Sequence, residues 1–335
     1  MRDNINLQKA KNVKYDEFYT TFETIEKELV HYFKHFHYKT VFCNCDDPFE
    51  SNFCRFFLRY FNILNLRRLI CTSYSKSKMF NSSFKKKAYM LDVSHFSDTA
   101  GIISDSEIKT LLLQYGVIKK LNGDGDFRSQ ECVELLRESD IVVTNPPFSL
   151  FGDFVKLLVS NNKKFLIIGN QNALTYKDIF PLIQKNKVWT GYQFGEMKFR
   201  VPDDSEPRRT RFWVDKDGKK WRSLGNAMWL TNLDIDKHHK LLPLSKKFNE
   251  KEYPEFDNYK AINVKTIHDI PFDYEGIMGV PITIINWLNN EQFEIIGEAN
   301  HGSDSEFDLF KPTIKGKMVF KRILIKNKRN TNEKL

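Results

Sequence analysis

The sequence lacks the features that mark secreted, metal-binding and membrane proteins. Its five cysteines are odd in number and include no C-x-x-C pair, which argues against both a disulfide framework and a zinc site. No apolar run approaches the ~18 residues that a membrane-spanning helix needs. The amino terminus has no apolar core of a signal peptide. With 41% apolar residues among 335, the chain is expected to be globular and cytoplasmic, with neither a bound metal nor a membrane partner.

A second absence concerns a loop that otherwise suits a nucleotide. The apolar run Thr40–Cys43 predicts a strand, and residues 44–53, N-C-D-D-P-F-E-S-N-F, supply a loop and the start of a helix that Ser51 can cap. Strand, loop and helix start form the first half of a nucleotide-binding βα unit. Such loops are normally rich in glycine, which lets the backbone approach the ligand, and this loop has none.

A third absence is that of an acid to hold a ribose. The second strand of a nucleotide-binding unit usually ends near a carboxylate that binds the ribose hydroxyls, but residues 51–91 contain no Asp or Glu. Three alternatives stay open. Ser73 or Ser75 replaces the acid, Asp46 or Asp47 reaches the ribose from the first loop, or the cofactor sits differently.

The most informative pattern present is Asp140–Phe148, D-I-V-V-T-N-P-P-F. Its β-branched run predicts a buried strand that stops at Asn145, because proline cannot donate to a sheet ladder. Ligands bind at the carboxyl ends of strands in open α/β sheets. The Asn145 side-chain oxygen and the Pro146 carbonyl can accept the two hydrogens of a planar amine, since Pro147 biases Pro146 to an extended conformation. Phe148 offers a flat face on which a base can stack.

Two such acceptors would draw an amine nitrogen toward tetrahedral geometry and make it a better nucleophile. The tetrad Asn145–Phe148 therefore suits methylation of an exocyclic amino group on a base. The alternative is a bare turn that ends a strand, because Asn-Pro dipeptides often mark turns.

The order of elements predicts an α/β fold. Strands and helices alternate from Thr40 to Gly169, which favours a doubly wound, mostly parallel sheet. The pattern changes after about Met197 and becomes more β-rich. Core strands are expected there at residues 279–284, 293–297 and 318–325.

Positive charge is unevenly distributed within a net charge of +9. Residues 311–335 carry nine lysines and arginines against one acid, Glu333, so this segment accounts for most of the net charge. A basic carboxyl-terminal arm indicates contact with a polyanion, and a solubilising tail is the alternative.

A second basic cluster is interleaved with the aromatic residues Phe212, Trp213 and Trp221. This pattern suits contact with phosphates and bases of a nucleic acid, while a charged hairpin around Asp217-Gly218 with a packed tryptophan is the competing interpretation. The candidate DNA-binding residues of both clusters are Arg208, Arg209, Arg211, Lys219, Lys220, Arg222, Lys321 and Arg322.

Several of these segments resemble a known family. T-N-P-P-F at 144–148 is similar to the catalytic motif of amino-group methyltransferases that use S-adenosylmethionine, especially the N6-adenine DNA enzymes. N-C-D-D-P-F-x-S-N-F at 44–53 resembles the cofactor motif of the EcoRI-type adenine-specific DNA methyltransferases. D-E-F-Y-T at 16–20 resembles the segment that touches the methionine part of the cofactor, and G-D-F at 125–127 resembles the segment whose Asp contacts its adenine part.

The resemblance spans most of the chain and implies both an architecture and a site. It implies a Rossmann-like S-adenosylmethionine-dependent methyltransferase sheet within residues 15–196 and a more β-rich DNA-recognition region in residues 197–335. The implied catalytic residues are Asn145, Pro146, Pro147 and Phe148. The implied cofactor-binding residues are Tyr19, Thr20, Cys45, Asp46, Asp47, Pro48, Phe49, Asp126, Phe127 and Asn145.

The implied reaction is methyl transfer from S-adenosylmethionine to N6 of an adenine flipped out of double-stranded DNA, for restriction-modification or protection of DNA. A cognate restriction endonuclease acting on the same site is the implied protein partner, and a monomer suffices for one methyl and one flipped base. Two alternatives remain. One changes the acceptor to RNA adenine or a protein glutamine. The other is a non-catalytic DNA-binding protein on a degenerate methyltransferase scaffold, which the missing glycines and ribose acid motivate.

Overall fold

The computed structural model describes residues 18–76, 87–96, 101–299 and 312–328. The chain divides into two compact units: Met1–Ala173 with Thr190–Leu233, and Leu174–Trp189 with Asp234–Leu335. The sequence-based boundary between residues 196 and 197 falls inside one strand of the first unit, because the chain returns to that unit's sheet after leaving it. No helix among the described residues is long and apolar enough to cross a membrane.

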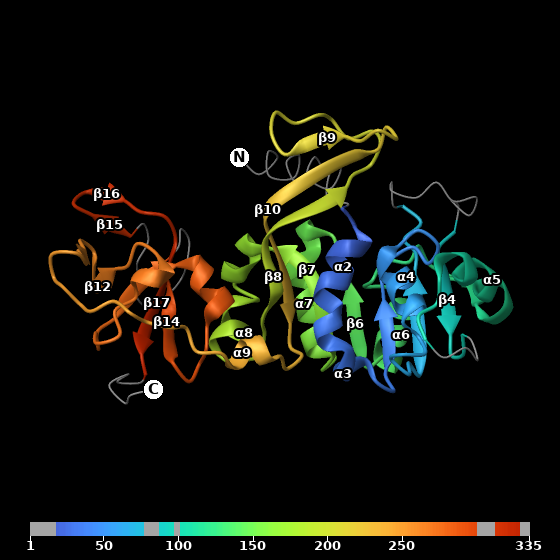
Figure 1. Ribbon diagram of the computed structural model, residues 1–335, viewed down its shortest axis with the longest axis horizontal. Helices are drawn as coiled ribbons and strands as arrows, with labels where there is room; N and C mark the ends of the chain where they lie inside the picture. Colours follow the sequence, from blue (N-terminus) through green and yellow to red (C-terminus); the bar gives the residue numbers. More distant parts are fainter. Residues whose placement is uncertain (1–17, 77–86, 97–100, 300–311, 329–335) are drawn as a thin grey trace. The chain divides into compact units, whose positions relative to one another are not determined.

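A ten-stranded mixed sheet organises the first unit (Figure 1), in the order β1-β8-β10-β7-β6-β2-β3-β4-β5 with β9 paired to β10. In that order the strands are β1 (Tyr19–Thr20), β8 (Trp189–Arg200), β10 (Lys220–Thr231), β7 (Lys164–Asn170), β6 (Ile141–Thr144), β2 (Thr40–Cys43), β3 (Arg68–Thr72), β4 (Tyr89–Val93) and β5 (Val117–Lys120), with β9 at Phe212–Val214.

Only the middle of this sheet is parallel. Strands β3, β2, β6 and β7 pair in parallel, whereas the pairs β3–β4, β4–β5, β7–β10, β10–β9 and β1–β8 are antiparallel. The expectation of a mostly parallel sheet is therefore wrong, although an α/β fold is confirmed. Apolar periodicity predicts that a strand is buried but not which way it runs, so the antiparallel flanks were not readable from the pattern.

The helices of the first unit follow the predicted alternation. They are α2 (Phe22–Leu29), continued by η1 (Val30–Tyr32) and α3 (Phe33–Phe36), then α4 (Asn52–Arg59), α5 (Asp105–Tyr115), α6 (Gln130–Glu138), η2 (Phe148–Leu150) and α7 (Phe151–Ser160). Ser51 caps α4 as expected, because its hydroxyl accepts from the Phe53 amide at 3.0 Å. All four residues of β2 and of β6 are buried, as suits central strands covered on both faces.

The second unit is β-rich, as the sequence predicted for the carboxyl-terminal region. Its five-stranded sheet has the order β11-β12-β13-β17-β14, and the apolar residues Ile323–Ile325 of β17 are fully buried in it. The strands are β11 (Glu255–Phe256), β12 (Tyr259–Asn263), β13 (Met278–Pro281), β17 (Arg322–Asn327) and β14 (Phe293–Ala299), beside a small pair β15 (Thr313–Ile314) and β16 (Lys317–Met318). Its helical segments include α8 (Phe180–Gln184), α9 (Asp236–His239), η4 (Ile267–Asp269) and η5 (Ile282–Trp287), and η3 (Gln171–Thr175) leads into it.

Two strand predictions in this unit need correction. The segment 279–284 is a strand only to Pro281 and then becomes a 3₁₀ helix, and the segment 318–325 is divided between β16 and β17. Proline lacks the N–H that would continue a ladder, and Gly316 with a φ of +73° makes the turn between β15 and β16. The segment 293–297 is confirmed as part of β14.

A buried carboxylate fixes α2 against β8 in the first unit. Glu28 has no exposed surface and accepts hydrogen bonds from the Tyr32 hydroxyl at 2.9 Å and from the backbone amides of Tyr192 and Gln193 at 2.7 Å each. A Cβ at Gly191 would lie 2.2 Å from the Glu28 Oε1 atom, so glycine is required for this approach. The contact holds β8, and through it β1, at the edge of the sheet.

The first prediction concerns this contact. Glu28→Ala removes a buried acceptor and leaves two backbone amides without partners, so we expect the free energy of unfolding to fall by about 3–4 kcal/mol. Glu23→Ala on the same helix is the control. Its side chain is 76% exposed and pairs with Lys27, and we expect a change within about 0.5 kcal/mol. Urea denaturation of both variants measures these changes. Equal losses of unfolding free energy would show that the Glu28 contact does not stabilise the fold.

Candidate active site

The loops after two parallel strands meet at one edge of the sheet. Strands β2 and β6 are paired, with Phe42 opposite Val142, so the segments 44–49 and 145–148 leave the sheet side by side. Thr144, the last residue of β6, joins them, because its hydroxyl lies within hydrogen-bond distance of the Asn44 carbonyl and of the Asp46 carboxyl group. The structure thus brings the predicted catalytic tetrad and the predicted cofactor loop together.

The amide of Asn145 has a fixed orientation. Its Nδ2 atom donates to the Phe18 carbonyl at 2.6 Å and lies 3.3 Å from the Thr20 hydroxyl. A carbonyl oxygen can only accept, so the nitrogen must face Phe18 and the oxygen must face away. The Asn145 Oδ1 atom is buried and has no hydrogen-bond partner among the described residues. A buried acceptor without a partner costs about 1–3 kcal/mol, which a ligand that donates a hydrogen there would recover.

The rest of the tetrad surrounds this acceptor. Pro146 is buried, and in the described part of the chain its carbonyl receives no hydrogen bond. Pro147 is extended, with φ −55° and ψ 126°, and Phe148 then opens the short helix η2. The half-buried Phe148 ring lies 5.2 Å from the Phe18 ring, centroid to centroid, with 33° between their planes. Two acceptors and an aromatic face therefore lie together at the end of β6.

In the predicted cofactor loop, a residue other than glycine adopts the backbone conformation that glycine usually provides. Cys45 adopts a φ of +66°, in the left-handed region that favours glycine and costs other residues roughly 1–2 kcal/mol. The next residue is held firmly, since the Asp46 amide donates to the Thr72 carbonyl at 3.1 Å. The turn that glycine usually allows is thus made here with a side chain in place.

Asp46 is the centre of a buried network. Its side chain accepts from the Ser51 hydroxyl at 2.8 Å and contacts the Thr144 hydroxyl, and burial raises its pKa to about 7. Thr144 has one hydroxyl hydrogen and cannot donate to both Asp46 and the Asn44 carbonyl. A proton on Asp46 resolves this, because Asp46 then donates to Thr144, which donates to Asn44. The geometry and the raised pKa agree that Asp46 is largely neutral below pH 7.

Asp47 is also committed to the loop itself. It is 2% exposed, accepts from the Tyr89 hydroxyl at 2.6 Å and from the Phe49 amide at 3.0 Å, and burial raises its pKa. The neighbouring Pro48 is buried. Phe49 differs, because its ring is 44% exposed and lies 5.9 Å from the Tyr89 ring. Within this loop, Phe49 is the aromatic surface that a ligand can reach.

The predicted methionine-contacting residues border the tetrad. Tyr19 and Thr20 form β1, which pairs with β8, and the Thr20 carbonyl accepts from the Asn52 side chain at 2.8 Å. Burial raises the pKa of Tyr19, and the nearby carboxyl groups of Glu50 and Asp46 raise it further. Tyr19 therefore lies near the cofactor loop and Thr20 near Asn145. Asp16 and Glu17 of the same motif lie outside the described residues.

Asp126 and Phe127 of the G-D-F motif differ in exposure. The Asp126 carboxylate is partly exposed and binds the Arg128 guanidinium through both oxygens, at 2.9 and 2.7 Å, which lowers the pKa of Asp126. Phe127 is only 3% exposed and packs against Phe154 at 4.9 Å, so its ring belongs to the core. Asp126 can reach a ligand, whereas Phe127 contributes mainly by anchoring the segment.

Contacts at the end of β3 narrow the alternatives for a ribose ligand. The Ser73 hydroxyl is engaged with the Tyr89 backbone, and a Cβ at Gly125 would lie 2.0 Å from the Ser73 carbonyl. The Ser73 hydroxyl is therefore occupied by the Tyr89 backbone, and the Ser73 carbonyl leaves no room for a side chain at Gly125. Ser75 is half-buried, and its hydroxyl makes no hydrogen bond with the described residues, so it remains available, whereas Asp46 and Asp47 are already hydrogen-bonded.

The predicted hairpin around Asp217-Gly218 is confirmed as β9 and β10. Trp213 and Trp221 stack with 6.3 Å between centroids, and Asp215 accepts from the Trp221 indole at 2.7 Å. The last residue of β7, Asn170, pairs with Ala227, so residues 220–226 of β10 run past the carboxyl ends of the parallel strands. The hairpin thus projects beyond the sheet on the side of the tetrad (Figure 1).

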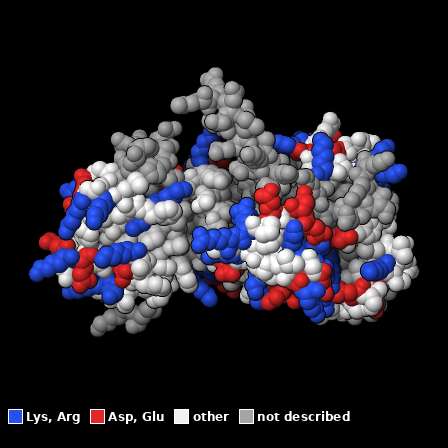
Figure 2. All heavy atoms as spheres, turned by 90° about the horizontal axis from the view of Figure 1, so that it is seen from above, with Lys and Arg blue, Asp and Glu red and all other residues white. Residues whose placement is uncertain are grey.

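The basic residues predicted to bind DNA are not one cluster. Arg208, Arg209, Arg211 and Lys219 are exposed in the first unit, Lys220 donates to the Ser205 carbonyl at 2.8 Å, and Arg222 is half-buried. Lys321 and Arg322 belong to the second unit, where Arg322 donates to Asn263 at 2.9 Å and Lys321 lies 3.4 Å from the Thr175 hydroxyl. Residues 311 and 329–335 of the basic segment lie outside the described residues. Basic and acidic side chains both occupy the face in Figure 2, so charge alone does not outline a DNA-binding surface on that face.

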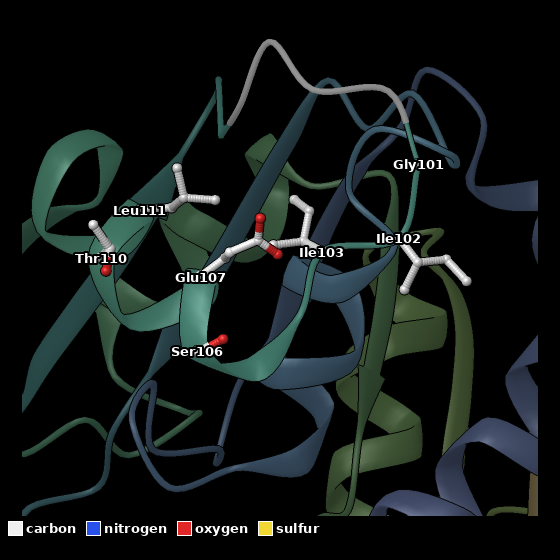
Figure 3. A pocket seen from close by; sticks show the side chains of 7 residues that line it. All are labelled: Gly101, Ile102, Ile103, Ser106, Glu107, Thr110 and Leu111. Atoms are coloured by element: carbon white, nitrogen blue, oxygen red, sulfur yellow. The ribbon is translucent and has the colours of Figure 1, made fainter.

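A separate hollow at α5 does not fit the chemistry. It encloses about 320 Å³ and none of the predicted site residues lines it (Figure 3). Its acid, Glu107, is already occupied in capping the helix, where it accepts from the Ser104 backbone amide at 2.8 Å. The lining residues are Gly101, Ile102, Ile103, Ser106, Glu107, Thr110 and Leu111.

Comparison with known proteins decides the family. The model of the family described as "Adenine-specific methyltransferase EcoRI" matches residues 6–333. The chain belongs to this family. It is 46% identical over 328 residues to the type II methyltransferase M.EcoRI of Escherichia coli, covering 96% of each chain. It is 36% identical over 340 residues to the type II methyltransferase M.MpnI of Mycoplasma pneumoniae, covering 96% of this chain and 98% of that protein.

The EcoRI-type resemblance of the sequence motifs is thereby confirmed. The chain is an adenine-specific DNA methyltransferase, and S-adenosylmethionine is its methyl donor. This outcome favours DNA over RNA and protein acceptors. No solved structure matches the chain.

Sequence reasoning missed two residues that organise the site. Phe18 lies within the D-E-F-Y-T motif, but the motif drew attention only to the two residues that follow it. Thr144 lies within T-N-P-P-F and was taken only as the end of a strand. The position of Thr144 directly before the tetrad was a signal, whereas the contact of Phe18 with Asn145 spans 127 positions and leaves no local pattern.

The second prediction concerns the titration of Asp46. A folded-state pKa raised above the unfolded value means that stability is greatest below the unfolded pKa and is lost as pH rises toward 7. Asp46→Asn removes this titration, so we expect the variant to gain stability relative to the parent protein between pH 5 and pH 8, on the order of 2–4 kcal/mol. Urea denaturation at several pH values measures the difference. A difference that is constant with pH would contradict a raised pKa, and one of opposite sign would show a carboxylate stabilised by the fold.

Proposed function

We propose that the chain methylates N6 of an adenine that has been flipped out of double-stranded DNA at a specific site. The observation that carries this proposal is the buried Asn145 Oδ1 atom without a hydrogen-bond partner in the described chain, beside the unengaged Pro146 carbonyl. Both are acceptors, and the exocyclic amine of adenine offers two hydrogens. Phe148, whose ring is half-buried, supplies a stacking face for the purine.

The residues at the sheet edge fit S-adenosylmethionine. The exposed Phe49 ring and the partly exposed Asp126 carboxylate offer a flat face and an acceptor, as an adenine group requires. Glu50, an exposed acid on the first loop, suits a ligand that carries a positive sulfonium. We infer that this loop, with Tyr19, Thr20, Asp126, Phe127 and Asn145, holds the cofactor, which supplies an electrophilic methyl group when bound.

The residues of the chain then act by orientation. Asn145 Oδ1 and the Pro146 carbonyl hold the two amine hydrogens, so the nitrogen lone pair is directed away from the ring plane. Neither acceptor needs to remove the proton before transfer, because the methylated amine is positively charged and loses its proton readily. Phe148 excludes water from one face of the base, and Pro147 keeps the Pro146 carbonyl free of a competing N–H.

The proposal also covers the type of sheet and the division of functions along the chain. We infer that the parallel strands β3, β2, β6 and β7 are the core of a Rossmann-like methyltransferase sheet, since the site lies at their carboxyl ends. We assign cofactor binding and catalysis to residues 15–196 and DNA recognition to residues within 197–335. Of the latter, Arg208, Arg209, Arg211, Lys219, Lys220 and Arg222 lie on or beside the hairpin, and Lys321 and Arg322 lie in the second unit.

We further propose that the enzyme acts as a monomer in a restriction-modification pair. One methyl group transferred to one flipped base needs one site, and each unit has its own buried core. The relatives are named type II methyltransferases, which supports a cognate restriction endonuclease that acts on the same DNA site.

The third prediction tests the tetrad. Asn145→Ala removes the orphan acceptor, and we expect transfer of labelled methyl groups to unmethylated DNA to fall at least about 10²-fold. Asn170→Ala is the control, because Asn170 ends the neighbouring strand and its side chain is already bonded to Asn226 at 3.0 Å. Analysis of the digested nucleosides identifies the product as N6-methyladenine.

Three results would count against the proposal. N6-methyladenine formed equally well by the Asn145→Ala variant would remove Asn145 from catalysis. Label found only in RNA or protein would change the acceptor. Absence of both cofactor binding and label in the parent protein would favour the non-catalytic DNA-binding alternative.

A further inference from the structure

Phe18 connects the catalytic tetrad to the DNA-facing hairpin. Its carbonyl accepts from Asn145 Nδ2 at 2.6 Å, and its ring lies 5.2 Å from the Phe148 ring. On the same ring, the Arg222 guanidinium lies 5.5 Å from the centroid, within cation–π distance. The Phe199 ring of β8 packs beside it at 5.5 Å. One residue therefore contacts the donor end of the Asn145 amide, the Phe148 ring and a cation of β10.

Among the described residues, Arg222 has no counterion. Its side chain is half-buried, and it makes neither a hydrogen bond nor an ion pair with the described residues. Burial lowers its pKa, and the nearby Arg208 guanidinium lowers it further. Arginine remains charged under these conditions, so two cations lie close together at a partly desolvated position. Such an arrangement is unfavourable in the free protein and favourable once an anion occupies it.

A small cavity lies where these cations meet. It holds about 20 Å³, and Phe18, Arg208 and Arg222 are among the residues that line it. The remaining lining residues are Val201, Pro202, Ser205, Glu206 and Phe212, of which Glu206 is an exposed acid. None of the residues assigned to the cofactor lines it. The whole cavity belongs to the first unit, and β10 carries Arg222 past the carboxyl ends of the parallel strands.

We propose that Arg222, with Arg208 beside it, binds a backbone phosphodiester next to the target adenine, and that Phe18 is the positioning residue that aligns this contact with the tetrad. The inference rests on the proposed function, because it takes a flipped adenine on Phe148 as given. A phosphodiester is the anion that accompanies every flipped base, and arginine binds phosphate oxygens through paired N–H groups. Anchoring the phosphate would fix the base relative to Asn145 and Phe148.

The position of Arg222 suits alignment of a nucleotide and not general attraction of DNA. An exposed lysine or arginine on the hairpin draws DNA from any direction and adds to affinity at every site. Arg222 is held by burial and by the Phe18 ring, so it can accept a phosphate only when a nucleotide is near the tetrad. It is therefore expected to affect the rate of transfer more than the initial binding of DNA.

The test combines protein variants with DNA in which one phosphodiester at a time is a neutral methylphosphonate. For the parent enzyme, one substituted linkage beside the target adenine is expected to lower kcat/KM about 10- to 100-fold. Arg222→Gln is expected to lower kcat/KM on ordinary DNA by a similar factor, and that same linkage should then cause no further loss. Arg222→Lys, which keeps the charge, should recover part of the rate. Arg137→Gln, on an exposed face of α6, is the control that should behave as the parent enzyme.

A second variant tests Phe18 as the connection. Phe18→Leu keeps the backbone carbonyl that holds Asn145 and removes the ring between Arg222 and Phe148. It is expected to lower kcat with little change in the Kd for S-adenosylmethionine, and the double variant Phe18→Leu/Arg222→Gln should lose less than the product of the two single losses. Phe18→Tyr, which keeps an aromatic ring, should retain most of the kcat of the parent enzyme. A merely structural role would instead lower the unfolding midpoint and weaken cofactor binding as well.

Several outcomes would overturn the proposal. If Arg222→Gln stays as sensitive to every linkage as the parent enzyme, Arg222 does not bind a phosphate beside the target. If Arg222→Gln weakens S-adenosylmethionine binding in calorimetry without DNA, the cavity holds the carboxylate of the cofactor instead. If the parent enzyme methylates no DNA at all, the proposed function fails, which is distinct from active enzyme without linkage coupling.

Discussion

The site depends on one hydrogen bond, from Asn145 Nδ2 to the Phe18 carbonyl. Because a carbonyl cannot donate, this bond fixes which end of the amide would face the proposed substrate, and it leaves a buried oxygen without a hydrogen-bond partner among the described residues. An unoriented asparagine could present its NH₂ group to the adenine amine and repel it. Phe18 directly precedes β1, which is paired to β8, and the buried Glu28 carboxylate fixes β8 against α2. Packing far from the tetrad therefore sets the direction of a single acceptor.

A second network holds the proposed cofactor loop without the usual glycines. Cys45 takes the left-handed backbone conformation, and Asp46 is anchored by Ser51, Thr144 and the Thr72 carbonyl. The hydroxyl of Thr144 ties this loop to the strand that ends in the tetrad, so cofactor and base would be presented on the same rigid edge. The strain of one non-glycine residue is offset by hydrogen bonds that a glycine-rich loop would not need. The missing glycines thus indicate a different construction of the loop and not a decayed site.

The sequence was informative where a local pattern determines the structure. A β-branched run followed by two prolines placed the tetrad at the end of a buried strand, and Asp217-Gly218 marked the hairpin. The direction of β10 and β4, the return of residues 190–233 to the first sheet, and the burial of Phe127 depend on long-range packing that periodicity does not encode. G-D-F looks the same whether its aromatic faces a ligand or Phe154. Phe18 was missed for the same reason, because its partners are distant in the chain and close only in the fold.

The most direct test of this account is a crystal structure of the enzyme with target DNA and a cofactor analogue that cannot transfer a methyl group. We expect an extrahelical adenine stacked on Phe148, with its N6 atom about 2.8–3.2 Å from both Asn145 Oδ1 and the Pro146 carbonyl. We also expect that Asn145 Nδ2 still donates to the Phe18 carbonyl. An adenine held elsewhere, or an Asn145 amide that has turned its NH₂ group toward the base, would contradict the central claim.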